Sequence, residues 1–181
     1  GGFHGDSDCL LTIEASVSSL IVDARGATLR MRKLDYLPPR YTKAEWRMLL
    51  SIRGATGVTI LGGKWVDAGG DGIYITSGEG SAVSHDVLLN GVVVTGAWRN
   101  GLSVISATNL RVVDSQFSET NGTNPQCGVD LEPNSPENRL QGIFFGNVTL
   151  TGNRRCGFSM GLYALVQSSA QFDVTVEHMR I

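Results

Sequence analysis

Two carboxylates that stand two positions apart, Asp130 and Glu132, are the residues of this sequence best suited to acid–base chemistry. On a β-strand both side chains would project from the same face, with their bases about 6 to 7 Å apart. Carboxyl groups at such a separation can serve as general acid and as base or nucleophile in glycoside hydrolysis. Their mutual repulsion raises the pKa of one partner, which divides the two roles. We therefore predict that Asp130 and Glu132 are catalytic, and that Asp71 is a third carboxylate that could join them.

The elements that would position these residues repeat along the chain. Four segments share the pattern turn residue, glycine, apolar, polar, apolar; they span 71–75, 100–104, 127–131 and 156–160. Their glycines are 29, 27 and 29 residues apart. Each segment reads as a half-buried strand that the chain enters through a tight turn. The run Leu50-Ser51-Ile52 fits one period earlier without the glycine.

Each period holds two further apolar clusters, for example 58–60 followed by 64–66. Three short strands in a coil of about 27–29 residues predict an all-β fold, a parallel β-helix. A four-stranded propeller blade would need about 40 residues, and the Leu/Asn consensus of leucine-rich repeats is absent. Residues 1–181 are predicted to form a single domain. The one plausible helix, 43–50, could equally be the approach to a strand at 49–52.

Stacking would order the side chains into columns, because successive coils lie about 4.8 Å apart. Apolar positions one and three after each glycine are expected to point inward, and positions two and four outward. The arginines on this outward face could hold an acidic sugar or an oxyanion, and Trp98 could stack on a sugar ring. The outward positions and the turns beside them supply the predicted substrate-binding residues: Tyr74, Trp98, Arg99, Asn100, Ser103 and Arg155.

Two other interpretations of the carboxylates stay open. Asp130 and Glu132 could be polar residues on a solvated sheet face, paired with Arg99 or Arg155. Alternatively, together with Asp71 they could hold Ca²⁺, which prefers oxygen ligands. Apart from this possible Ca²⁺, no metal or cofactor is predicted, because the three histidines are dispersed without the spacing of metal ligands.

Two of the three cysteines, Cys127 and Cys156, hold the same position in successive coils. Their Cα atoms should therefore lie about 5 Å apart, within the range of a disulfide. Stacked free thiols are the expectation here, because ladders of like residues are common in such coils, and a disulfide is the alternative.

The composition of the chain excludes some classes of binding partner. The chain has 181 residues, 23 of them Gly, with 41% hydrophobic residues and a net charge of −2. This balance argues against a disordered chain and against a nucleic-acid binder, which should carry a basic patch. No apolar run approaches the ~20 residues of a membrane span, so neither nucleic acid nor membrane is predicted as a partner.

Two segments depart from the repeat. Residues 32–46, which include Pro38-Pro39, are predicted to protrude as an insertion from the first full coil and could wall one side of the outward face. The final strands around 174–181 lack a polar cap. Since open strand edges are usually covered, we expect either a fragment of a longer solenoid or an oligomer formed through this uncapped end.

The glycine-centred runs 69–75, 100–104 and 128–134 resemble those of right-handed parallel β-helix proteins of the pectate-lyase-like superfamily, over roughly residues 20 to 181. The resemblance implies a secreted or cell-surface protein that cleaves or modifies a polysaccharide, as a glycoside hydrolase, lyase or epimerase. The alternative is a non-catalytic carbohydrate-binding or structural module, such as part of an adhesin or tailspike. The Asn-Thr-Asp and Gly-His-Gly motifs of polygalacturonases and the Asp-Pro-His-Asp motif of mannuronan epimerases are absent, so the resemblance implies no single reaction.

Overall fold

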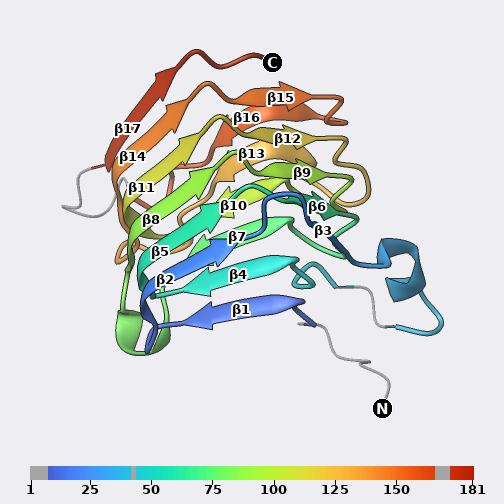
Figure 1. The fold of residues 1–181 in the computed structure, drawn as a ribbon, viewed down its shortest axis with the longest axis horizontal. Helices are drawn as coiled ribbons and strands as arrows, with labels where there is room; N and C mark the ends of the chain where they lie inside the picture. Colours follow the sequence, from blue (N-terminus) through green and yellow to red (C-terminus); the bar gives the residue numbers. More distant parts are fainter. Residues whose placement is uncertain (1–7, 42–43, 166–171) are drawn as a thin grey trace.

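The computed structural model describes residues 8–41, 44–165 and 172–181, and these form a right-handed parallel β-helix (Figure 1). Every strand runs parallel to its neighbours, and each coil contributes one strand to each of three sheets, except the last coil, whose described residues supply strands to two of them. Figure 1 shows the coils stacked in chain order. The predicted fold class is therefore confirmed.

The three sheets are named A, B and C. Sheet A contains β1 (Leu11–Glu14), β4 (Leu50–Arg53), β7 (Ile73–Thr76), β10 (Leu102–Val104), β13 (Cys127–Leu131) and β16 (Cys156–Met160). Sheet B contains β2 (Ser18–Asp23), β5 (Thr56–Leu61), β8 (Ser84–Asn90), β11 (Ala107–Val113), β14 (Leu140–Gly146) and β17 (Phe172–Glu177). Sheet C contains β3 (Thr28–Arg30), β6 (Lys64–Val66), β9 (Val93–Thr95), β12 (Gln116–Ser118) and β15 (Thr149–Thr151). Two 3₁₀ turns, η1 (Lys33–Tyr36) and η2 (Glu79–Ser81), lie in the connections.

The register of sheet A follows the sequence repeat. Leu102 pairs with Ile73 on one side and with Val129 on the other, and Leu50 pairs with Ile73 one coil earlier. Sequence reasoning missed the first coil, in which Leu11 pairs with Leu50. The segment between β3 and β4 leaves the coil and makes this period longer than the others, so the repeat does not reveal it. Residues 44–49 form no helix, and strand β4 begins at Leu50.

The core lies inside the coil, where the three sheets face one another. Inward residues of sheet A such as Ile75, Val104 and Leu131 are fully buried, as predicted, but the same prediction was wrong for Met160 in β16, which is 49% exposed. Trp65 and Phe117 fill the same interior from sheet C, and the Trp65 Nε1 donates a hydrogen bond to the Gly62 carbonyl at 3.1 Å. Burial of such columns removes apolar area from water continuously along the stack, which holds the coils together.

The glycines at the start of β7, β10 and β13 are required by the close approach of the next coil. A Cβ built on Gly72 would lie 2.6 Å from the Gly101 carbonyl oxygen, and one on Gly101 would lie 2.6 Å from the Gly128 carbonyl oxygen. Sequence reasoning attributed these glycines to tight turns, but none of the three has a positive φ. The structure therefore assigns them to contact between successive backbones.

Replacing Gly101 with alanine is expected to destabilise the fold by about 2 to 3 kcal/mol, because the new methyl group meets backbone, which cannot rotate away. Urea unfolding would measure this change in the free energy of unfolding. Gly161→Ala is the matched control, since nothing lies within 4 Å of its Cβ position, and it should change stability by less than about 0.5 kcal/mol. Equal effects of the two substitutions would contradict the account.

One register position of sheet B has a left-handed backbone conformation in five successive strands. Ser19, Gly57, Asp86, Asn109 and Gly142 occupy one register position, and all five have positive φ. The left-handed region is accessible to Gly and, among other residues, best to Asn and Asp. The Asn109 side chain also donates a hydrogen bond to Asp86 in the coil before it. The turns between sheets B and C repeat the device, with Asn147 Nδ2 donating to Asp114 Oδ1 at 2.7 Å.

The two stacked cysteines are joined by a disulfide. Cys127 and Cys156 are direct register partners, and their Cα atoms lie 4.6 Å apart. The expectation of free thiols was wrong, because the register that places like residues above one another also brings these two Cβ atoms within bridging distance. The bond links β13 to β16, next to the outward face described below.

Candidate functional site

Most of the predicted site residues gather on the outward face of sheet A. Asp71 lies in the turn before β7, and Arg99 and Asn100 lie in the corresponding turn before β10. Glu132 directly follows β13. Because equivalent positions of successive coils stack, residues about 30 positions apart in sequence become neighbours across strands separated by about 4.8 Å.

Arg99 is the centre of this cluster. Its Nη1 lies 3.2 Å from Asp71 Oδ2, its Nη2 donates to Glu132 Oε2 at 2.7 Å, and its Nε lies 3.5 Å from Glu45 Oε2. Burial acts to lower the pKa of Arg99, but the attraction of Asp71 and Glu132 outweighs it and raises the pKa. The guanidinium therefore stays protonated and cannot act as a base.

A buried hydrogen-bonded layer fixes the position of Asp71. The Asn100 backbone N–H donates to Asp71 Oδ1 at 2.9 Å, while Asn100 Nδ2 donates to Ser103 Oγ at 3.1 Å and to Asp130 Oδ2 at 3.2 Å. Asn100 Oδ1 accepts from the Cys127 backbone N–H at 3.0 Å. Asn100 and Ser103 are fully buried. Asn100 thus uses its backbone N–H and both polar atoms of its side chain, Oδ1 and Nδ2, to connect three successive coils by hydrogen bonds.

Both aspartates of the cluster are buried, and burial changes their acidity. It raises the pKa of Asp71 to about 6, although the Arg99 charge and the Asn100 N–H act in the opposite direction. Burial also raises the pKa of Asp130, with repulsion from Glu132 adding to the effect and a hydrogen bond from Ser159 opposing it. A carboxyl group with such a pKa can hold a proton in mildly acidic solution and donate it.

Three carboxyl groups, those of Glu45, Asp71 and Glu132, line one small pocket of about 120 Å³. Asp71 and Glu132 contact the two terminal nitrogens of the same guanidinium, so both carboxyl groups lie beside one positive charge. The pocket is lined by Glu45, Trp46, Asp71, Tyr74, Arg99, Ile105, Glu132 and Asn134. The arrangement combines a carboxyl group of raised pKa, a second carboxylate and a fixed positive charge.

Five predicted site residues do not line this pocket. Asp130 projects from the outward face but is only 3% exposed, because the Arg99 and Asn100 side chains lie against the same face, and Ser103 is buried with it. Trp98 is half-buried, and a Cβ on Gly122 would lie 2.2 Å from its ring, so it packs against the next coil. Arg155 is exposed. Asn100 is likewise absent from the pocket lining, and it acts through Asp71.

Sequence reasoning missed three residues at the pocket: Glu45, Trp46 and Asn134. Trp46 is 53% exposed, which is unusual for so large an apolar side chain and suits stacking on a ligand. The only available signal was the position of Glu45 and Trp46 at the end of segment 32–46, which was expected to wall the outward face. Asn134 lies in the connection after β13, where the sequence repeat does not predict the path of the chain.

Within the described ranges, no group of three or more His, Cys, Asp or Glu side chains is arranged to hold a metal ion. The Arg99 guanidinium lies between Asp71 and Glu132, where a shared cation would otherwise bind. A search of the same residues finds no helix with the length and hydropathy of a membrane span.

The raised pKa of Asp71 predicts a pH-dependent stability. Its folded-state pKa is about 6 against an ordinary 3.8, so between these values the folded protein binds more protons than the unfolded chain. The stabilising contribution of the protonated group is complete below pH 3.8 and is lost as pH rises through 6. Relative to Asp71→Asn, the wild-type protein should therefore lose up to about 3 kcal/mol between pH 4 and pH 7.5.

Urea unfolding of both proteins across this pH range measures the difference directly. Other carboxylates contribute equally to both proteins and cancel in the comparison. If the free energy of unfolding changed with pH in the same way for the wild type and for Asp71→Asn, Asp71 would have the same pKa in the folded and unfolded chains, contrary to this expectation.

Comparisons with models of protein families, with curated proteins and with solved structures gave no match to this chain.

Proposed function

We propose that this protein is carbohydrate-active, and that it cleaves or modifies a polysaccharide at the pocket of Asp71, Arg99 and Glu132. One observation carries the proposal: a buried carboxyl group whose pKa is raised to about 6 opens into a pocket beside a second carboxylate. Groups whose environments separate their pKa values in this way are suited to divide acid and base roles. On this proposal the chain is related to the pectate-lyase-like β-helix proteins and acts outside the cell, secreted or at the surface.

Among the reactions considered, the site favours hydrolysis. Asp71 would donate its proton to the glycosidic oxygen, and Glu132 would act on the sugar from the other side, as base toward water or as nucleophile. A lyase or epimerase that used Arg99 as base is disfavoured, because the carboxylates around Arg99 raise its pKa. Arg99 would instead stabilise negative charge, and the exposed ring of Trp46 would stack on a sugar.

A second candidate is a carbohydrate-binding or structural module without catalysis. It is favoured by the pairing of Arg99 with both pocket carboxylates and by the burial of Asp130. In that case the role of this cluster of paired charges would be to stabilise the contact between successive coils. The two candidates share the fold and differ in whether a bond is broken.

A panel of polysaccharides, neutral and acidic, separates the candidates. We expect new reducing ends without absorbance from unsaturated uronic products, because the site supports hydrolysis rather than elimination. Appearance of both signals would replace hydrolysis with lyase chemistry. Binding of a polysaccharide without any product would favour the second candidate, and silence in both assays would contradict the proposal.

A further inference from the structure

The pocket that Asp71 shares with Glu132 carries more negative than positive charge. Its charged lining residues are three acidic side chains, Glu45, Asp71 and Glu132, and one basic side chain, Arg99. Three carboxylates against one guanidinium leave an excess of two negative charges, or of one when Asp71 holds its proton. This excess bears on which sugars can enter, because a cleft lined mainly by one sign of charge attracts ligands of the opposite sign.

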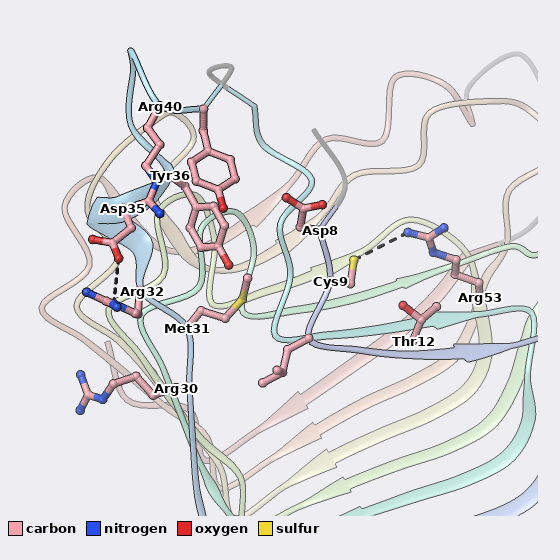
Figure 2. Close-up of a pocket in the computed structure, with 12 residues that line it drawn as sticks. Asp8, Cys9, Thr12, Arg30, Met31, Arg32, Asp35, Tyr36, Arg40 and Arg53 are labelled. Atoms are coloured by element: carbon pink, nitrogen blue, oxygen red, sulfur yellow. Dashed lines mark hydrogen bonds and ion pairs between the residues drawn. The ribbon is translucent and has the colours of Figure 1, made fainter. Parts of the chain in front are cut away.

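The arginine of β4 does not offset this excess. Arg53 is directed into a separate pocket of about 730 Å³ at the first coils, where its Nη2 lies 3.9 Å from Cys9 Sγ (Figure 2). The positive charge in the pocket of Asp71 is therefore that of Arg99, and its Nη1 and Nη2 already face Asp71 and Glu132. An acidic ligand would have to compete with both carboxylates for this one guanidinium.

Glu45 is the carboxylate of the pocket that the proposed hydrolysis does not use. Its Oε2 lies 3.5 Å from Arg99 Nε, and that nitrogen forms no hydrogen bond, so the contact is a loose ion pair. Among the described residues, Glu45 forms no other ion pair and no side-chain hydrogen bond, and its side chain is 45% exposed. Because an ionised carboxylate only accepts hydrogen bonds, Glu45 presents a negatively charged acceptor to a ligand in the pocket.

The backbone on both sides of Glu45 is fixed by packing. A Cβ built on Gly70, in the turn before β7, would collide with the Glu45 carbonyl oxygen and lie 2.8 Å from the Arg47 backbone nitrogen. The Arg47 side chain is 1% exposed and lies 5.3 Å from the centroid of the Tyr36 ring. Glu45 and the exposed ring of Trp46 are thus held at the pocket before a ligand binds.

We propose that this pocket selects a sugar that carries a protonated amino group, and that Glu45 is the residue that recognises this group. The selectivity rests on the proposed function, because it assumes that the pocket receives a sugar ring. An ammonium group brings one positive charge and three hydrogen-bond donors, which suit the Glu45 carboxylate, and the face of the Trp46 ring attracts a cation. A uronic acid brings only further acceptors at its carboxylate and would place it against the carboxylates of the pocket. The favoured polysaccharide is therefore one that contains amino sugars.

Binding of monosaccharides at pH 5.5 and low salt, followed by NMR at the Trp46 indole N–H and assigned with Trp46→Phe, tests the proposal. Glucosamine should bind at least about tenfold more tightly than glucose, because it adds a hydrogen bond between charged groups. N-acetylglucosamine, in which the amine is a neutral amide, should bind like glucose, and glucuronate should bind more weakly than glucose. Glucosamine that binds no better than N-acetylglucosamine, or glucuronate that binds as well as glucosamine, would overturn the proposal.

Two substitutions locate the recognition. Glu45→Gln removes the charge and should lower the affinity for glucosamine at least about fivefold, while the affinity for glucose stays within about twofold. Glu79→Gln makes the same change in net charge at an exposed residue outside the pocket and should keep the preference for glucosamine. A poorly folded variant would lose affinity for both sugars. An unchanged preference in Glu45→Gln, or an equal loss of preference in Glu79→Gln, would overturn the role of Glu45.

Binding and cleavage can fail separately in this experiment, because none of these monosaccharides contains a glycosidic bond. Preferential binding of glucosamine without cleavage of any polysaccharide would overturn the catalytic part of the proposed function and support the selectivity. Cleavage of a neutral polysaccharide by a protein that does not prefer glucosamine would overturn the selectivity and support the proposed function.

Discussion

Replacing Asp71 with asparagine is expected to lower the rate of polysaccharide cleavage by at least about 100-fold, the usual contribution of a positioned general acid. Asparagine keeps the shape and still accepts the hydrogen bond of the Asn100 N–H, but it carries no proton that it can donate. The rate of formation of reducing ends, measured at pH 5 to 6 where the carboxyl group is protonated, would reveal this loss.

Two further variants serve as controls for the loss of activity expected of Asp71→Asn. Asp114→Asn makes the same chemical change at an exposed turn and should keep full activity. Asp130→Asn should retain activity within about tenfold of wild type, because Asp130 does not line the pocket and contacts Asn100 behind it. If Asp130→Asn were inactive and Asp71→Asn active, the role that we give to Asp71 would belong to Asp130.

Removing Arg99 is expected to have the largest effect on stability. At pH 7, Arg99→Gln should destabilise the protein by about 3 to 5 kcal/mol, because it leaves Asp71 as a buried charge without its partner. At pH 4 the cost should be smaller, since Asp71 can take up a proton and become neutral. Urea unfolding at the two pH values measures both quantities.

A double variant tests the reason for this loss. If the buried charge of Asp71 is responsible, Arg99→Gln combined with Asp71→Asn should be more stable at pH 7 than Arg99→Gln alone. A cost below about 1 kcal/mol for Arg99→Gln, or a double variant no more stable than the single one, would place Arg99 among exposed ion pairs of little consequence.

The coil architecture was predictable because the interior imposes a strict pattern on the sequence. Inward positions such as Ile73 and Leu102 must be apolar, and Gly72 and Gly101 must lack a Cβ where successive backbones touch. These constraints recur in each coil and can therefore be recognised. The first coil escaped detection because the chain leaves the repeat before β4, and the disulfide was left open because stacked thiols and a disulfide fit the same register.

The site was predictable only in part. The columns brought Asp71, Arg99 and Glu132 to one face as expected, but whether an outward residue is exposed depends on what covers it. Asp130 is buried by neighbours from other coils, and Trp46 reaches the pocket from a segment that follows no repeat. Both aspartates are buried and have a raised pKa, but only Asp71 lines the pocket, and the irregular segments that complete the pocket are not described by periodicity.

The central claim is that Asp71 holds a proton in mildly acidic solution at the pocket it shares with Glu132. Observation of the Asp71 carboxyl carbon by NMR through a pH titration of the wild-type protein, assigned with Asp71→Asn, tests it most directly. The account predicts a midpoint at about pH 6. A midpoint at or below the ordinary value of 3.8 would contradict it, because Asp71 would then be ionised in mildly acidic solution.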